Sequence, residues 1–348
     1  MKRVLLTGIG GSIAVHFLAH FMHNTDWEIV GIDSFRHKGW TDRVDAILNT
    51  DEPEHPGGHP EWKKRLTILT HDLTAPFSQM MMDKIGHIDY IISMASLSDV
   101  EASIQDPVPF IRNNVELTVN LLELARVLKP EVFVQISTDE VYGAVSSKHD
   151  DLRKEWDPIV PSNPYAASKA CQEAIAISYW RTYGVPLIIT NTMNNFGEMQ
   201  QSSKFPAMIQ KWLAAGKKVT IHGRPGEIGS RSYIHSRNFA DAILFLLQNT
   251  KPHMHEPNKA DKPDRYNIAG DKQLDNLELA QVISKLMGQK ELDYELVDTH
   301  TQRPGHDPHY GLDNEKIFNL GWRPPKTFEE SMKNTVEWQN SHPDWMKN

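Results

Sequence analysis

Tyr165 and Lys169 are the two residues of this sequence best suited by type and spacing to move a proton. On a helix, side chains at i and i+4 share one face, so these two side chains would be neighbours. A free phenol, with a pKa of about 10, is a poor base at neutral pH, but a neighbouring ammonium lowers that pKa. Such a pair can accept a proton from an alcohol as hydride leaves its carbon. The alternative is an exposed polar pair. Pro164, at the expected helix start, favours the catalytic interpretation.

A second cluster of reactive side chains follows an expected strand at residues 132–137. Thr138, Asp139 and Glu140 come directly after it, and ligands bind at the carboxyl ends of strands in open parallel sheets. Two carboxyl groups in different environments can serve as one acid and one base. The alternative is a solvated turn or a helix cap.

A glycine-rich turn joins the first expected strand to the first expected helix. It contains Gly8, Gly11 and Ala14 at intervals of three residues. Glycine lets the backbone approach a pyrophosphate, a small third residue lets the helix pack on the strand, and the helix N-terminus attracts phosphate. Asp33 ends the second expected strand, where a carboxylate would bind an adenosine ribose. The pattern predicts a dinucleotide site, and the alternative is a glycine turn without a ligand.

The acidic residue at the end of the second strand also predicts which dinucleotide is bound. Asp33 should repel a 2′-phosphate and hydrogen-bond a free ribose hydroxyl, which favours NAD over NADP. Arg36 and Lys38 are close in sequence and count against this preference. Asp72, after the third strand, is a candidate for the adenine edge or else a turn or N-cap aspartate.

Alternating strand and helix patterns must position these groups. Strands are expected at residues 4–7, 28–33, 66–70, 90–95, 132–137 and 187–191, and helices at 13–23, 109–127 and 165–183. Repeated strand–helix units with right-handed crossovers predict an α/β fold with a doubly wound parallel sheet.

The pattern loosens after Asn195 and predicts a second, smaller domain. Helices are expected at residues 205–215, 238–247, 277–287 and 328–339, and short strands at 219–221 and 266–268. We therefore expect a dinucleotide-binding domain at residues 1–195 and a smaller α/β substrate domain at 196–348, whose segments can interleave with the first.

Composition restricts the partners and the compartment. The chain has 348 residues, with 45 acidic and 37 basic side chains and a net charge of −8, which argues against nucleic acid as a partner. The one cysteine, Cys171, excludes an intramolecular disulfide. No apolar stretch reaches a membrane span, and we expect a cytoplasmic protein. The histidine pairs His55/His59 and His253/His255 lack a ligand framework, so no metal site is expected.

The motifs together resemble the dTDP-glucose 4,6-dehydratases of the extended short-chain dehydrogenase/reductase superfamily, over nearly the whole chain. The matching segments are TGIGGSIA at 7–14, ASLSDVEASI at 95–104, STDEVYG at 137–143, PYAASKA at 164–170, ITNTMNNFG at 189–197, YNIAG at 266–270 and RPGHD at 303–307. The Thr-Asp-Glu triplet is the specific part, because epimerases and decarboxylases of the superfamily usually lack that acid pair. The resemblance implies a Rossmann-type fold and NAD as cofactor.

The resemblance also implies roles for five residues in the conversion of a nucleotide-diphosphate sugar to its 4-keto-6-deoxy form. Tyr165 would deprotonate the 4-hydroxyl, tuned by Lys169, and Thr138 would bind the 4-oxygen. Glu140 would remove the proton on carbon 5, and Asp139 would protonate the departing 6-hydroxyl.

Further positions match the family's ligand contacts. The implied cofactor contacts are Ser12, Ile13, Asp33, Asp72, Leu73, Ala95 and Asn195, beside the glycine turn. The implied substrate contacts are Ser98, Asn194, Lys204, Arg231, Asn267, Arg303 and Tyr310. The guanidinium groups of Arg231 and Arg303 would suit a diphosphate, and the alternative is that they are exposed surface arginines.

Four departures from the family pattern leave the nucleotide base, thymine or uracil, open. These are Ser93, Asp99 where histidine is usual, Ser203 where an acid is usual, and Ser232-Tyr233 after Arg231. Two alternatives stay open: an NAD-dependent 4-epimerase or decarboxylase, which would not need the acid pair, and a dinucleotide-sensing regulator, which would be expected to lose Tyr165 or Lys169.

Oligomerisation is predicted from the helix at residues 109–127. Ile111, Val115, Val119 and Leu122 line one face, and Leu117, Leu121 and Leu124 line a second apolar face that one sheet cannot cover. We expect a homodimer in which this helix and the helix at 165–183 pair with their symmetry copies.

Overall fold

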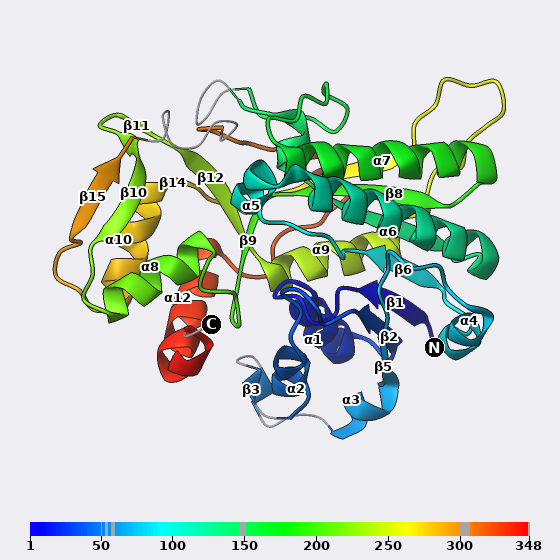
Figure 1. Cartoon of the computed structure of the whole chain (residues 1–348), viewed down its shortest axis with the longest axis horizontal. Coiled ribbons are helices and arrows are strands. Elements are labelled where there is room, and N and C mark those ends of the chain that lie inside the picture. Colours follow the sequence, from blue (N-terminus) through cyan, green and yellow to red (C-terminus); the bar gives the residue numbers. More distant parts are fainter. Residues whose placement is uncertain (50, 53–54, 57–59, 146–150, 299–306, 347–348) are drawn as a thin grey trace.

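A parallel sheet of seven strands forms the larger part of the molecule (Figure 1). The computed structural model describes residues 1–49, 51–52, 55–56, 60–145, 151–298 and 307–346. Across the sheet the strands run in the order β13 (Asp264–Ile268), β8 (Leu187–Thr192), β7 (Val132–Thr138), β6 (Tyr90–Ser93), β1 (Arg3–Thr7), β2 (Glu28–Asp33) and β5 (Leu66–Thr70). All neighbouring pairs are parallel, which confirms the predicted α/β doubly wound fold.

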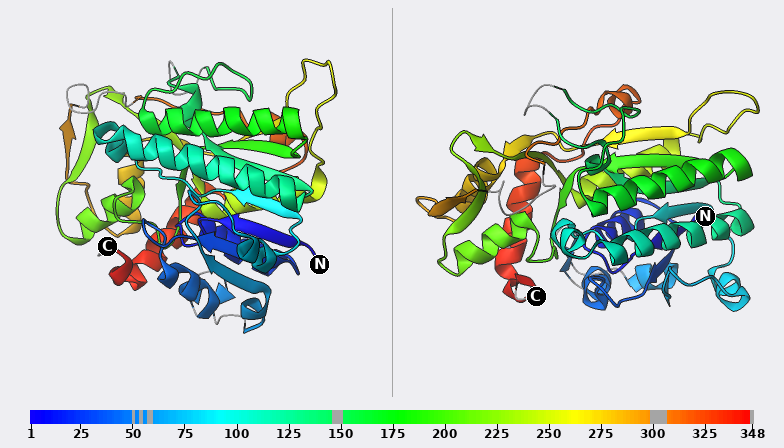
Figure 2. Two further views of the ribbon diagram at one scale, coloured as in Figure 1. Left: turned by 45° about the vertical axis from the view of Figure 1, so that its right-hand side comes forward. Right: turned by 45° about the horizontal axis from the view of Figure 1, so that its top comes forward.

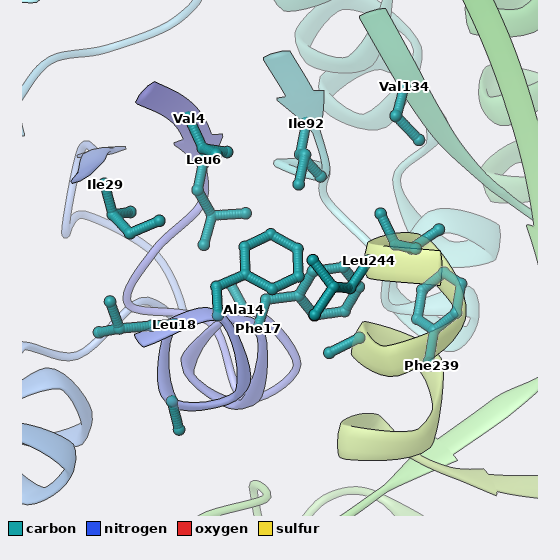
Figure 3. Packing of buried hydrophobic residues seen from close by; sticks show 14 of the residues in the cluster. Val4, Leu6, Ala14, Phe17, Leu18, Ile29, Ile92, Val134, Phe239 and Leu244 are labelled. Carbon is teal, nitrogen blue, oxygen red and sulfur yellow. The ribbon is translucent and has the colours of Figure 1, made fainter. Parts of the chain in front are cut away.

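One face of this sheet is covered by α1 (Ala14–Asn24) and α9 (Ser236–Asn249). Alternate strand residues such as Val4 and Leu6 point towards Phe17 of α1 and Phe239 of α9 (Figure 3). The two phenyl rings meet edge to face at 5.3 Å. Because residues two apart on a strand share a face, the short apolar runs read from the sequence account for this core.

The opposite face is covered by α6 (Pro107–Leu128) and α7 (Pro164–Tyr183), which lie side by side in both views of Figure 2. Leu117, Leu121 and Leu124 are buried in one core cluster with Ala176 and Trp180 of α7. The second apolar face of α6, expected to need a partner subunit, is therefore covered within a single chain. The sequence-based expectation that this face needs a partner subunit was wrong, because it considered only the sheet and not α7 as a packing partner.

Shorter elements connect the strands of the large sheet. They are α2 (Thr41–Asn49), β3 (Asp51–Glu52), β4 (His55–Pro56) and α3 (Pro60–Arg65) between β2 and β5, α4 (Gln79–Ile85) before β6, α5 (Val100–Gln105) before α6, and the 3-10 helix η1 (Asp139–Tyr142) after β7. The side chain of Asp99 caps α5 by accepting a hydrogen bond from the Ala102 N–H.

In the residues that the structure describes, the smaller part of the molecule contains two three-stranded sheets and three helices. The sheets are β14 (Gln273–Asp275), β12 (Ser230–His235) and β9 (Asn194–Phe196), and β11 (Glu227–Ile228), β10 (Val219–Arg224) and β15 (Tyr294–Val297). The helices are α8 (Phe205–Ala214), α10 (Asn276–Leu286) and α12 (Phe328–Ser341), with α11 (Glu315–Asn319) beside β13 and the 3-10 helix η2 (Pro343–Met346) near the C-terminus.

The chain passes between the two parts more than once. Both α9 and β13 follow residue 195 yet belong to the large sheet layer, so segments interleave across the predicted boundary. Strand β6 ends at Ser93, before the predicted end at residue 95, because the N–H groups of Met94 and Ala95 donate to Thr7 Oγ1. Within the described residues, no helix is long and apolar enough to cross a membrane.

Candidate active site

A cavity of about 1710 Å³ lies where the large sheet meets the smaller part. Its walls include the segments that follow β1, β2, β5, β6, β7 and β8, together with residues of α8, β10 and β12. Predicted cofactor residues that line it are Gly8, Gly11, Ser12, Ile13, Ala14, Asp33, Asp72, Leu73, Ala95, Tyr165, Lys169 and Asn195. Predicted substrate residues that line it are Ser98, Thr138, Asn194, Lys204, Arg231 and Tyr310. Carboxyl ends of parallel strands meet at one sheet edge, which brings these distant segments together.

The glycine turn after β1 has the backbone geometry that its sequence requires. Gly8 has a φ of +72°, and a Cβ at this position would lie 3.2 Å from the Ala95 Cα. Its N–H donates to the Ile32 carbonyl at 2.7 Å, and the Gly11 N–H donates back to the Gly8 carbonyl at 2.8 Å. A side chain at Gly8 would be strained and crowded, so the turn needs glycine there.

Asp33 fixes the loop that follows β2 against the glycine turn. Its carboxylate accepts hydrogen bonds from Gly10 N–H at 3.0 Å and Phe35 N–H at 2.9 Å. Behind them, the fully buried Arg43 donates to the carbonyls of Gly10 and Lys38 at 2.8 and 2.7 Å. Burial lowers the pKa of Arg43 to about 10. Sequence reasoning missed Arg43, since nothing in its local sequence separates it from a surface arginine.

Arg36 and Lys38, the two cations that could bind a 2′-phosphate, each form an ion pair with an acidic residue. Arg36 pairs with Asp72, and the Lys38 Nζ lies 2.7 Å from Asp99 Oδ2. Asp72 also accepts hydrogen bonds from the N–H and hydroxyl of Thr74, so it is a turn aspartate as well as a cavity residue. Partial burial opposes ionisation of Asp99, but its bond to Lys38 holds its pKa below the usual value.

Thr138, Asp139 and Glu140 enter the cavity at the end of β7. The Thr138 hydroxyl donates to Asp139 Oδ1 at 2.9 Å. Asp139 is 4% exposed, and burial together with the charge of Glu140 raises its pKa to about 7. Burial also raises the pKa of Glu140, although a hydrogen bond from Asn163 opposes that rise. At neutral pH the site therefore offers a carboxyl that retains a proton for part of the time beside a second carboxyl with a different partner.

Tyr165 and Lys169 line the same cavity, but their electrostatics differ from the sequence expectation. Burial and the charges of Glu140 and Asp139 raise the pKa of Tyr165 above its usual value, and a hydrogen bond with Thr138 opposes the rise. The Lys169 ammonium donates to the Ile136 carbonyl at 2.7 Å and to Gln172 Oε1 at 2.6 Å. Burial lowers the pKa of Lys169 to about 8. Lys169 is not among the groups that shift the Tyr165 pKa, so the expected lowering is not found, and burial and the acid pair raise that pKa instead.

Arg231 and Tyr310 line the same cavity as the acid pair. Arg231 is 8% exposed and donates to the carbonyls of Ser230, Asp307 and Pro308 at 2.6–2.7 Å. Its guanidinium lies 4.5 Å from the centre of the Tyr310 ring. The alternative that Arg231 is an exposed surface arginine was therefore wrong. Arg303 lies outside the described residues.

Asn267, a predicted substrate contact, is not among the described residues that line the cavity, and its role stays a prediction. It is fully buried, donates to the Arg153 carbonyl at 2.8 Å and accepts a 3.3 Å bond from the Tyr142 hydroxyl. These partners come from η1, which contains Tyr142, and from the segment before α7, which contains Arg153. The same buried network includes Asn191, which donates to the Thr138 carbonyl at 3.0 Å, so the network supports the catalytic segment from behind.

His16, Glu198 and His235 form a buried cluster that sequence reasoning did not single out. The Arg237 N–H donates to Nδ1 of His235 at 3.1 Å, so the proton of a neutral His235 is on Nε2, which lies 3.0 Å from Glu198 Oε2. A metal would need that nitrogen without its proton. This tautomer therefore favours a hydrogen-bonded structural cluster over a metal site. The cluster connects α1, through His16, and the start of α9, through His235, to Glu198 in the segment after β9.

The comparisons with known proteins agree with this geometry. The family model described as GDP-mannose 4,6 dehydratase matches residues 5–335. The chain belongs to this family. A dTDP-glucose 4,6-dehydratase of Neisseria meningitidis serogroup B is 31% identical over 367 residues, covering 100% of this chain and 96% of the relative. The low-salt glycan biosynthesis protein Agl12 of Haloferax volcanii is 32% identical over 336 residues, covering 96% and 97%.

Solved structures place this 4,6-dehydratase family member in the same fold. DesIV, a dTDP-glucose 4,6-dehydratase from Streptomyces venezuelae solved with NAD bound, superposes with a TM-score of 0.83 at 27% identity, covering 99% of this chain and 98% of DesIV. The UDP-glucose 4-epimerase of Thermus thermophilus superposes with a TM-score of 0.80 at 23% identity, covering 97% and 99%, and shows the fold alone. The predicted membership in the nucleotide-sugar 4,6-dehydratases of the extended short-chain dehydrogenase/reductase superfamily is confirmed.

Proposed function

We propose that the protein is an NAD-dependent nucleotide-sugar 4,6-dehydratase that converts dTDP-glucose or UDP-glucose to the 4-keto-6-deoxy sugar. The observation that carries this proposal is the pair Asp139 and Glu140, held beside Thr138 and Tyr165 in the cavity that also contains the glycine turn. The net reaction removes one water from the sugar: carbon 4 becomes a ketone, and carbon 6 exchanges its hydroxyl for hydrogen. In the elimination step a proton leaves carbon 5 and the hydroxyl leaves carbon 6, and a proton returns to carbon 5 when hydride is added at carbon 6.

The cofactor end of the cavity fits NAD. Among the described residues, no group hydrogen-bonds the buried Oδ1 of Asn195, which lines this cavity. The glycine turn, Asp33, Asp72, Leu73, Ala95 and Asn195 would hold the dinucleotide. The ion pairs of Arg36 and Lys38 leave both cations with acidic partners, which supports NAD over NADP. A dinucleotide held there would supply the hydride chemistry, by which carbon 4 would be oxidised and carbon 6 later reduced.

The proton steps fall to the side chains around the sugar. Tyr165, which has a hydrogen bond with Thr138, would take the proton of the 4-hydroxyl as phenolate, a form that burial and the acid pair disfavour and that the positive charge of a bound nicotinamide would favour. Thr138 would orient the 4-oxygen. Glu140 would take the proton of carbon 5, which the neighbouring ketone makes acidic. Asp139, with its pKa raised to about 7, would give its proton to the departing 6-oxygen. Such positioned groups contribute roughly 100- to 10,000-fold each.

A 4-epimerase or decarboxylase is the second candidate. Its support is the similarity in fold to a UDP-glucose 4-epimerase that was solved in complex with NAD. An acid pair inside the cavity has no role in plain oxidation and reduction at carbon 4, and this favours the dehydratase. A non-catalytic regulator is disfavoured, since Tyr165 and Lys169 both line the cavity.

The assembly and location of the enzyme complete the proposal. We propose a cytoplasmic homodimer that pairs α6 and α7 with their copies, and a division into a cofactor domain and a smaller substrate domain near residue 195. Ile111 of α6 is 42% exposed in the single chain, which supports a partner at that surface.

The reaction is tested with a panel of dTDP-, UDP-, GDP- and CDP-glucose, analysed by mass spectrometry and NMR. We expect loss of one water from the dTDP or UDP sugar with the nucleotide retained. Glu140→Gln should leave single-turnover NADH formation measurable but stop deuterium uptake at carbon 5, because oxidation at carbon 4 does not need that base. Inverted sugar without loss of water would favour the epimerase.

A further inference from the structure

Asn163 lies directly before α7, and the two ends of its side-chain amide have different partners. Its Oδ1 accepts a hydrogen bond of 2.9 Å from the Ala166 N–H and so caps the first turn of α7. Its Nδ2 donates a hydrogen bond of 3.0 Å to Oε2 of Glu140. Asn163 is only 6% exposed, so water competes weakly for either bond.

The bond from Asn163 orients the carboxylate that would act at carbon 5. Among the described residues, Asn163 is the one side chain that hydrogen-bonds the Glu140 carboxylate. Burial raises the pKa of Glu140, the Asn163 bond lowers it, and the nearby charges of Arg231 and Lys204 lower it while Asp307 raises it. The amide therefore sets both the direction of the carboxylate and its readiness to accept a proton.

The same residue fixes the start of the helix that carries Tyr165. Pro164 follows Asn163 at the first helical position, and the Tyr165 N–H donates to the Ser103 hydroxyl at 3.2 Å. With its backbone held at both positions, Tyr165 keeps its place relative to Glu140. An amide suits this double role because it offers an acceptor and a donor at once, whereas serine caps without reaching Glu140 and ionised aspartate has no donor.

We propose that Asn163 is a positioning residue for proton removal at carbon 5, which it serves by joining Glu140 to the helix of Tyr165. The inference rests on the proposed dehydratase function. The two carboxyl groups should respond differently to loss of Asn163. Asp139 accepts its hydrogen bond from Thr138 and does not depend on Asn163. Loss of the amide should therefore affect the carbon 5 step more than oxidation at carbon 4.

The first test is Asn163→Ser, which retains a good helix cap and removes the donor to Glu140. We expect deuterium uptake at carbon 5 to fall by about 10- to 100-fold at neutral pH, the range for losing one hydrogen bond to a charged group. NAD content and single-turnover NADH formation should stay close to those of the parent. The probe is dTDP-glucose or UDP-glucose, whichever the parent consumes.

The pH profile of the carbon 5 step distinguishes positioning from a general loss of structure. Glu140 acts as a base only when ionised, and the Asn163 donor favours the ionised form. Without that donor the pKa of Glu140 rises, so the acidic limb of the exchange profile should move to higher pH. Asn163→Asp, which keeps the cap but adds a like charge, should move it further in the same direction.

Thr327→Ala is the matched control, because Thr327 caps α12 by accepting from Glu330 N–H and is not among the described cavity residues. It should lower the melting temperature without moving the exchange profile. The proposal is overturned if both Asn163 variants exchange carbon 5 with the parent's rate and pH profile, or if their exchange falls only in proportion to folded protein. A parent that oxidises the sugar but neither exchanges carbon 5 nor loses water would instead contradict the dehydratase function.

Discussion

Asp139 has a pKa raised to about 7, and this value concerns stability as well as catalysis. Its Oδ1 accepts from Thr138, while no described group hydrogen-bonds its buried Oδ2. Below the usual aspartate pKa of 3.8, the folded and unfolded chains both hold the proton. As pH rises from there to about 7, the unfolded chain releases it first, so the stability of the folded chain falls across this window.

Asp139→Asn should therefore stabilise the protein at alkaline pH while impairing water loss. We expect the free energy of unfolding at pH 8 to rise by about 1 to 4 kcal/mol over the parent, with little difference at pH 4. Urea unfolding at both pH values measures this, with the exposed Asp45→Asn as control. A variant that is less stable than the parent at pH 8 would contradict the inference that burial of the ionised Asp139 carboxylate destabilises the folded chain.

The loop between β2 and α2 acts at the scale of an element, because its two cations reach neighbouring strands. The sheet order places β6 and β2 on either side of β1. Lys38 follows β2, and Asp99 lies in the connection after β6. Their ion pair therefore crosses the carboxyl end of β1, where the glycine turn would hold the pyrophosphate. We therefore expect this pair, whose two residues line the cavity, to hold the loop closed over its cofactor end.

Asp99→Asn should release bound NAD faster. An exposed ion pair is worth about 0.2 to 1 kcal/mol, so we expect dissociation to increase about 1.4- to 5-fold, and added salt should reduce the difference. Displacement of bound NAD, followed by protein fluorescence, gives the rate. Asp298→Asn, which breaks the Arg224–Asp298 pair away from the described cavity lining, is the control. Equal release from parent and Asp99 variant at low salt would argue against closure by this pair.

The outer surface of α6 is the relevant feature at the scale of the whole molecule. Its second apolar face is covered by α7, but Ile111 is 42% exposed, and Val115 and Val119, at successive helical turns, are half-buried. Residues spaced by four share a helix face, so these three form one apolar stripe. A two-fold axis beside α6 would bring this stripe against its copy.

Ile111→Glu should convert the proposed homodimer to monomers, because two buried like charges would face each other across the axis. Light scattering at micromolar concentration measures the mass of each protein. Met80→Glu on α4 is the control, since Met80 is 69% exposed and outside α6 and α7. A parent that is monomeric and fully active would rule out the dimer.

The element pattern followed from the sequence because short apolar runs and helical spacing are local properties. Helix α7 and strands β2 and β5 lie within one residue of their predicted bounds. Strand β12 was missed, because its buried residues include Arg231, Ser232 and His235 rather than an apolar run. The short helix α5 was missed as well, although Asp99 supplies a cap signal three residues before Ala102.

The sequence by itself determined which side chains could act, since Thr138, Asp139, Glu140, Tyr165 and Lys169 follow from residue type, spacing and the rule that strand ends converge. Tertiary structure alone decided the pKa values of these side chains and the hydrogen-bond networks that hold them in place. The Tyr165 pKa is raised rather than lowered, and Asn267 belongs to a buried network. Such outcomes depend on burial and on charges contributed by distant segments. Local sequence cannot specify them, because desolvation and Coulomb interactions act through space.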